Sequence, residues 1–107
     1  MDAIAKARGA RLVIGIDTVA ARRDLGKRFG CDEVLDPSAM SEADLVKRVK
    51  SLCKPEGADA VIEVCGYPSV IPSGIQMLRT GGHYVLGGVV NPDSFVNIDV
   101  NLILRKL

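Results

Sequence analysis

The chain has 107 residues, of which 48% are hydrophobic and 25% charged, and its formal net charge is +1. Length and composition predict one globular domain over residues 1–107 with a single modest core. The balanced charge, without a dense basic run, argues against nucleic acid and anionic membrane surfaces as partners. No apolar run approaches the roughly 20 residues that span a bilayer, and the N-terminus has no signal-peptide pattern.

The cysteines and the histidine do not form a recognisable metal site. Cys31, Cys53 and Cys65 share no Cys-x-x-Cys spacing, and His83 is the one histidine available to join them. We therefore predict no metal ligands in this chain. We expect the cysteines to pack as small apolar side chains in a reduced, cytoplasmic protein.

The first third of the chain alternates helix and strand patterns. Helix formers over residues 2–8 end at Gly9. The apolar run Arg11–Asp17 lacks polar alternation, which predicts a strand of a parallel sheet that is buried on both faces. A helix over residues 20–29 follows, with apolar residues on one face and basic residues opposite, and then a short strand over residues 33–36.

The rest of the chain continues this alternation. Ser41 and the acids after it predict a helix N-terminus, and the helix carries Leu45, Val49 and Leu52 inward. The expected elements are a helix over residues 41–53, a strand over 58–65, a helix over 69–79, a turn at 80–82, a strand over 83–86 and a short extension over 96–100. Such alternation predicts an α/β fold with a parallel sheet and right-handed crossovers.

Asp17 stands at the carboxyl end of the first expected strand, and Arg22 follows within the next helix. An acid at the end of a strand of a dinucleotide-binding fold accepts hydrogen bonds from the adenosine ribose. The alternative is that Asp17 caps the following helix by accepting its free backbone N–H groups. The residues alone leave both interpretations open.

Five stretches carry a more specific pattern: Ala5–Ala10, Val13–Asp17, Phe29–Pro37, Gly57–Gly66 and Leu78–Gly87. In this order and at these spacings they resemble the medium-chain dehydrogenase/reductase family over almost the whole chain. The resemblance implies an oxidoreductase segment: the Rossmann-like, nicotinamide-dinucleotide-binding domain of a zinc-type alcohol dehydrogenase. In such enzymes the metal ligands lie mainly in the catalytic domain, so the resemblance implies no zinc here.

The resemblance also implies NAD as the cofactor and places its contacts. Asp17 matches the acid that binds the adenosine ribose hydroxyls and favours NAD over NADP. Arg22 matches the base that closes over that ribose, although without the resemblance a solvated helix charge is the preferred interpretation. The remaining implied contacts are Val64, Cys65 and Gly66, beside the adenine and ribose, and Leu86, Gly87 and Gly88, toward the nicotinamide. Turns need such glycines with or without a ligand. Glu63 is expected to be structural, and no residue is expected to be catalytic.

The chain departs from the family pattern at the phosphate site. It contains no Gly-x-Gly-x-x-Gly motif, whose backbone N–H groups bind the pyrophosphate. Each such bond to a charged group contributes roughly 1.5–3 kcal/mol. Losing two or three removes about 3–9 kcal/mol, against roughly 8 kcal/mol for a micromolar ligand. We therefore expect a domain truncated at both ends that binds NAD weakly or not at all and is not catalytic alone.

The expected truncation also bears on assembly. In the family's strand order the first strand lies between the second and the fourth, so its absence leaves two strand edges exposed. Either these strands pair directly or two chains associate, and we predict a homodimer through the exposed edges. Two alternatives to an inert dehydrogenase segment stay open. One is a non-catalytic self-associating or interaction module, and the other is a subunit complemented by a separate catalytic chain.

Overall fold

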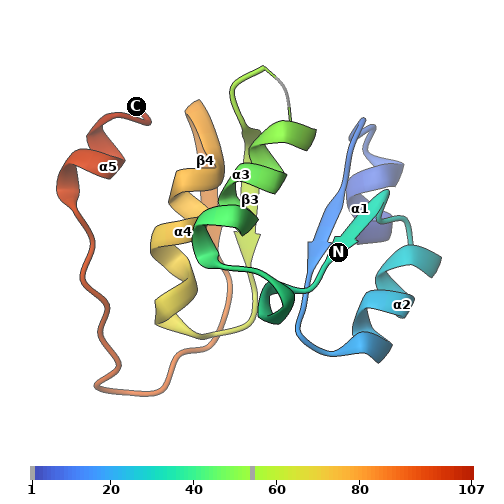
Figure 1. The fold of residues 1–107 in the computed structure, drawn as a ribbon, viewed down its shortest axis with the longest axis horizontal. Coiled ribbons are helices and arrows are strands. Elements are labelled where there is room, and N and C mark those ends of the chain that lie inside the picture. The colour runs from blue at the N-terminus through green and yellow to red at the C-terminus, as the bar shows by residue number, and fades with distance from the viewer. Residues whose placement is uncertain (1, 54) are drawn as a thin grey trace. The chain divides into compact units, whose positions relative to one another are not determined.

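The computed structural model describes residues 2–53 and 55–107, so Met1 and Lys54 of the predicted 1–107 domain lie outside the described residues. The chain is an α/β structure that divides into two compact units, Met1–Leu45 and Val46–Leu107. Each unit contains a two-stranded parallel sheet (Figure 1). The predicted α/β fold with parallel strands is therefore confirmed.

The first unit is built on the pair β1–β2. Its elements are α1 (Asp2–Ala7), β1 (Ile14–Ile16), α2 (Ala20–Arg28), β2 (Glu33–Leu35) and a 3-10 turn, η1 (Pro37–Ala39). Gly15 of β1 lies opposite Val34 of β2 in parallel register. The Asp32 N–H donates to the Val13 carbonyl at 2.8 Å and the Asp17 N–H to the Leu35 carbonyl at 3.2 Å. These bonds continue the pairing over most of the predicted 11–17 strand.

The apolar residues of the first unit are less buried than their pattern indicates. Ile16 is 40% exposed, so the prediction that this strand is buried on both faces is wrong there. Leu25 of α2 and Phe29, the C-cap residue of α2, are 48% and 58% exposed. The helix instead approaches the sheet through Gly26, where an added Cβ would lie 3.5 Å from Cγ1 of Val34 in β2. The helix comes close here because Gly26 has no side chain, and not because an apolar side chain packs against the sheet.

The second unit is built on the pair β3–β4. Its elements are α3 (Glu42–Leu52, which begins in the first unit), β3 (Ala58–Glu63), η2 (Pro68–Val70), α4 (Ile71–Met77), β4 (Leu78–Leu86) and α5 (Val100–Leu104). The predicted cap of α3 is present, because Ser41 Oγ accepts the Asp44 N–H at 3.1 Å. Leu45 and Val49 are buried as expected. Helix α4 contacts both strands and buries Ile75.

The turn expected at residues 80–82 is a bulge inside a longer strand. Pairing runs from Ala58 with Leu78 to Ala60 with His83, so β3 advances two residues while β4 advances five. The pairing then continues in register to Glu63 opposite Leu86. The strand expected over 83–86 is therefore the second half of β4.

The C-terminal segment forms a helix where we had expected none. Residues 96–99 are irregular rather than a strand extension, and α5 follows (Figure 1). Lys106 Nζ donates to the Leu78 carbonyl at 2.6 Å, and the Gly81 N–H donates to the Lys106 carbonyl at 2.6 Å. These bonds fasten the end of the chain to the start of β4.

Candidate functional site

Asp17 lies just beyond the carboxyl end of β1 and shapes the turn into α2. Its Oδ1 accepts the Val19 N–H at 2.8 Å, and its backbone carbonyl accepts Arg23 Nη1 at 2.8 Å. The N-cap of α2 is Val19, and no side chain caps it. Asp17 therefore closes an Asx-turn before the helix rather than capping the helix itself, which leaves its second oxygen, Oδ2, outside the turn.

The two adjacent arginines of α2 have different surroundings. Arg22 Nη1 lies 3.8 Å from Asp17 Oδ2, and the Arg22 side chain is 71% exposed. Arg23 is 20% exposed and lies 3.4 Å from Asp36 Oδ2, so it ties the ends of β1 and β2 together. An exposed ion pair contributes about 0–1 kcal/mol. Arg22 can therefore leave Asp17 for a ligand at little cost, whereas Arg23 belongs to the framework.

Asp17 and Arg22 line an open hollow of about 390 Å³ in the first unit. Its lining consists of Asp2, Ala3, Asp17, Arg22, Leu25, Gly26 and Phe29. The exposed apolar side chains of α2 thus lie beside the predicted ribose-binding residues. Apolar surface with a few converging polar groups is the usual composition of a small-molecule site.

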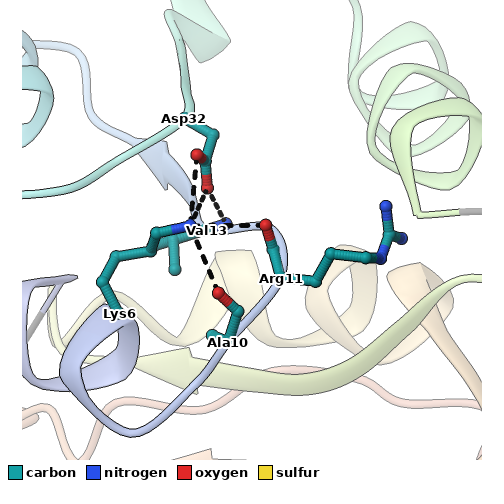
Figure 2. Close-up of polar contacts among 5 residues, drawn as sticks. All are labelled: Lys6, Ala10, Arg11, Val13 and Asp32. Carbon is teal, nitrogen blue, oxygen red and sulfur yellow. Dashed lines mark hydrogen bonds and ion pairs between the residues drawn. The ribbon is translucent and has the colours of Figure 1, made fainter.

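A polar link that our sequence analysis missed holds α1 to this sheet (Figure 2). Lys6 Nζ lies 3.1 Å from Asp32 Oδ2 and donates to the Ala10 and Arg11 carbonyls at 3.2 and 3.3 Å. Asp32 Oδ2 also accepts the Val13 N–H at 2.7 Å. The Val13 N–H and then Lys6 hold the pKa of Asp32 below its usual value. One carboxylate therefore joins the end of α1, the start of β1 and the start of β2.

The carboxyl ends of β3 and β4 carry the second group of predicted residues, and Glu63 organises them. Glu63 is 5% exposed, and its Oε1 accepts the N–H groups of Cys65 at 2.6 Å and Gly66 at 2.7 Å. The Gly87 N–H donates to the Glu63 carbonyl at 2.8 Å. Hydrogen bonding from the Cys65 side chain is the largest influence on the pKa of Glu63, which lies below its usual value although burial opposes the shift.

Two of the predicted glycines are required by the backbone itself. Gly66 has φ +77°, and a Cβ there would collide with the Val89 carbonyl oxygen. A Cβ at Gly88 would lie 2.5 Å from Gly66 N and 2.7 Å from Glu63 Oε2. Gly87 has more room, with its nearest neighbour, the Glu63 carbonyl oxygen, at 3.4 Å. The steric explanation of these glycines therefore holds for Gly66 and Gly88 but not for Gly87.

The eight predicted residues thus form two groups, one in each unit. Asp17 and Arg22 belong to the first unit, and the six others gather at the carboxyl ends of β3 and β4, where Val64 and Leu86 are each 58% exposed. Among residues 2–53 and 55–107, no three His, Cys, Asp or Glu side chains are placed to hold a metal ion. Within the same ranges no helix has the length and hydrophobicity to cross a membrane.

The sequence was compared with models of known protein families. Residues 3–107 match the family model described as zinc-binding dehydrogenase. The chain belongs to the zinc-binding dehydrogenase family. The family resemblance predicted from the sequence is therefore confirmed.

Curated relatives from this family are several times longer than the chain. D-guloside 3-dehydrogenase of Escherichia coli strain K12 is 39% identical over 79 residues, which cover 74% of this chain and 22% of that protein. L-threonine 3-dehydrogenase of Bacillus subtilis strain 168 is 37% identical over 98 residues, which cover 92% and 27%. The chain therefore spans 22–27% of the length of these two dehydrogenases.

Solved structures of two dehydrogenases contain the same fold. A putative zinc-binding dehydrogenase from Sinorhizobium meliloti 1021, bound to NADP, superposes with a TM-score of 0.87 at 29% identity and covers 98% of this chain and 30% of its own. An alcohol dehydrogenase from Thermotoga maritima gives a TM-score of 0.89 at 30% identity and covers 97% and 29%. The chain therefore corresponds to about 30% of each of these proteins, the first of which is bound to NADP.

Proposed function

We propose that this chain supplies the adenosine-ribose and nicotinamide-side contacts of an NAD-binding region in a zinc-type alcohol dehydrogenase. We further propose that the 107-residue polypeptide alone performs no hydride transfer and binds NAD weakly. The observation that carries the proposal is the state of Asp17, which lines an open hollow: its Oδ1 accepts the Val19 N–H, while its Oδ2 lies 3.8 Å from the exposed Arg22 guanidinium.

This geometry supports NAD rather than NADP as the ligand. A carboxylate oxygen accepts hydrogen bonds from ribose hydroxyls but repels the 2′-phosphate of NADP. Arg22, 3.8 Å from Asp17 Oδ2, can cover the ribose from the other side. The Sinorhizobium relative is bound to NADP, so the choice of NAD for this chain rests on Asp17 rather than on the family.

The proposed weakness follows from the phosphate contacts. Residues 1–107 contain no Gly-x-Gly-x-x-Gly loop, and α1, with six residues, begins without one. The ribose contacts remain, but about 3–9 kcal/mol of phosphate binding is missing. Starting from a micromolar site, the smaller loss already raises the dissociation constant to above about 0.1 mM.

Calorimetry of the 107-residue chain with NAD and NADP tests both parts of the proposal. We expect a dissociation constant for NAD weaker than about 0.1 mM, and a further loss in Asp17→Asn. Asp24→Asn is the matched control, because Asp24 is an exposed acid of the same unit outside the hollow. A low-micromolar constant for NAD contradicts the proposed weakness, and tighter binding of NADP than NAD contradicts the role of Asp17.

Self-association is a second candidate function. Each described sheet contains two strands, and exposed apolar side chains lie on β3 and β4, including Ile62 at 47% and Val85 at 49% exposure. Unpaired strand edges beside apolar surface favour pairing with another chain. We propose a homodimer formed through such edges, in which the chain acts as an assembly module or as a subunit completed by a separate catalytic chain.

A further inference from the structure

Glu63 is a buried carboxylate that the proposed ribose contacts do not use. It is 5% exposed, and Oε1 takes both the Cys65 and the Gly66 N–H groups. Oε2 is buried and has no hydrogen-bond partner of good geometry among the described residues, although the Gly88 N–H faces the carboxylate closely enough to lower its pKa. Burying an ionised group is costly unless its charge is compensated.

The two N–H groups that compensate Glu63 form an anion-binding concavity. Successive backbone N–H groups that converge on one point, as those of Cys65 and Gly66 do, ordinarily attract phosphate or another external anion. In this chain the point of convergence is occupied by Glu63 Oε1, at 2.6 and 2.7 Å. No further anion can use these donors while the Glu63 side chain is in place.

The same side chain touches the second turn. A Cβ at Gly88 would lie 2.7 Å from Glu63 Oε2, and the Gly87 N–H is bonded to the Glu63 carbonyl. The carboxylate therefore lies between the turn after β3 and the turn after β4. Its removal leaves two N–H groups without their acceptor and a gap between two backbones that are otherwise in contact.

We propose that Glu63 is the positioning residue of this corner: its carboxylate is an internal anion that fixes both turns and excludes phosphate from the Cys65 and Gly66 N–H groups. The corner then offers the exposed Val64 and Leu86 side chains to a ligand, while the Cys65 and Gly66 N–H groups stay bonded to Glu63. One part of this proposal depends on the proposed function: that the ligand of this corner is NAD.

Amide hydrogen exchange and amide chemical shifts of the 107-residue chain test the proposal. We expect the Cys65 and Gly66 amides to exchange about tenfold faster or more in Glu63→Ala, with the other amides of β3 and β4 retained. Glu63→Gln keeps one oxygen acceptor but loses the charge. Because hydrogen bonds to charged acceptors are roughly twice as strong as those to neutral ones, we expect exchange rates for these two amides between those of the unsubstituted chain and Glu63→Ala. Glu56→Gln is the matched control, since Glu56 is exposed in the same unit.

A second measurement needs no stable variant. In the unsubstituted chain, acid titration should move the Cys65 and Gly66 amide resonances together as Glu63 is protonated. Inorganic phosphate at neutral pH should leave both resonances in place, but should shift them in Glu63→Ala, where the donors are freed. Separate movement of the two resonances, equal exchange in the Glu63→Gln and unsubstituted chains, or a phosphate response of the unsubstituted chain at these amides overturns the proposal.

Adding NAD to the unsubstituted chain separates this inference from the proposed function. Shifts at residues 64–66 and 86–88 support NAD as the ligand of this corner. Shifts near Asp17 and Arg22 without shifts at residues 64–66 and 86–88 count against NAD as the ligand of this corner. Whatever the response to NAD, the expected results of the exchange, acid and phosphate experiments support the role of Glu63 as the residue that holds both turns.

Discussion

Comparing alanine substitutions at two glycines of the second unit measures how much stability depends on the close contact between the Gly66 and Val89 backbones. Gly66 and Gly81 have nearly the same backbone conformation, with φ +77° and +74°. They differ in what a Cβ would meet. At Gly81 the nearest atom is the tip of the flexible Arg79 side chain at 3.4 Å, whereas at Gly66 it is the Val89 carbonyl oxygen, which belongs to the backbone and lies too close for any carbon.

The expected magnitudes follow from these neighbours. Placing an L-residue at positive φ costs roughly 1–2 kcal/mol, and this term is common to both variants. Forcing backbone apart in a packed region adds about 1–3 kcal/mol, and it applies only to Gly66→Ala. We therefore expect Gly66→Ala to destabilise the protein by about 2–5 kcal/mol and Gly81→Ala by about 1–2 kcal/mol.

Urea unfolding followed by circular dichroism measures both changes, and thermal unfolding should agree, at about 4–8 °C for each kcal/mol in a domain of 60–100 residues. The difference between the variants is the informative quantity, because the positive-φ term cancels. Equal destabilisation by the two substitutions, or a larger effect at Gly81, refutes the reasoning that contact between the Gly66 and Val89 backbones constrains this corner.

Three further predictions concern other parts of the chain. The Val13 N–H and Lys6 hold the pKa of Asp32 below its usual value of 3.8. The link therefore stabilises the fold above pH 3.8, and this stabilisation is lost as the pH falls through the lowered pKa. In Asp32→Asn we expect urea unfolding midpoints, measured from about pH 2 to pH 7, to fall less at acid pH than in the unsubstituted chain. Lys106→Met removes the 2.6 Å bond to the Leu78 carbonyl, and we expect faster amide exchange in α5 with the rest of the unit unchanged. In sedimentation at tens of micromolar we expect a dimer, and a clean monomer counts against pairing through strand edges.

The fold class could be predicted because its signal is local. Runs such as residues 11–17 and 58–65 are apolar without alternation, and the helix signals between them require parallel connections. The bulge in β4 could not be separated from a turn, because Thr80-Gly81-Gly82 has the composition of both. Helix α5 was missed because its five residues give too short a pattern to show a period.

The candidate site was predictable where one residue type at one position carries the chemistry. The position of Asp17 at a strand end followed from the sequence in this way, its role toward a ribose stays a proposal, and the structure adds that its two oxygens have different partners. The Lys6–Asp32 link was not predictable, because 26 residues separate the partners and a lysine and an aspartate have no distinguishing local pattern. The contact of α2 through Gly26 was also hidden, since a hydrophobic pattern cannot register a side chain that is absent.

Under the proposed preference for NAD, the unequal roles of the Asp17 oxygens limit how a redesign could change the coenzyme to NADP. Alanine at position 17 removes the repulsion of a 2′-phosphate but also the acceptor that the Val19 N–H uses at 2.8 Å, so the entry into α2 loosens together with Arg22. Serine keeps one hydroxyl acceptor for an ST-turn and carries no charge. A change of coenzyme in this scaffold should therefore tolerate serine better than alanine, because the arginine that would pair with the added phosphate stays oriented.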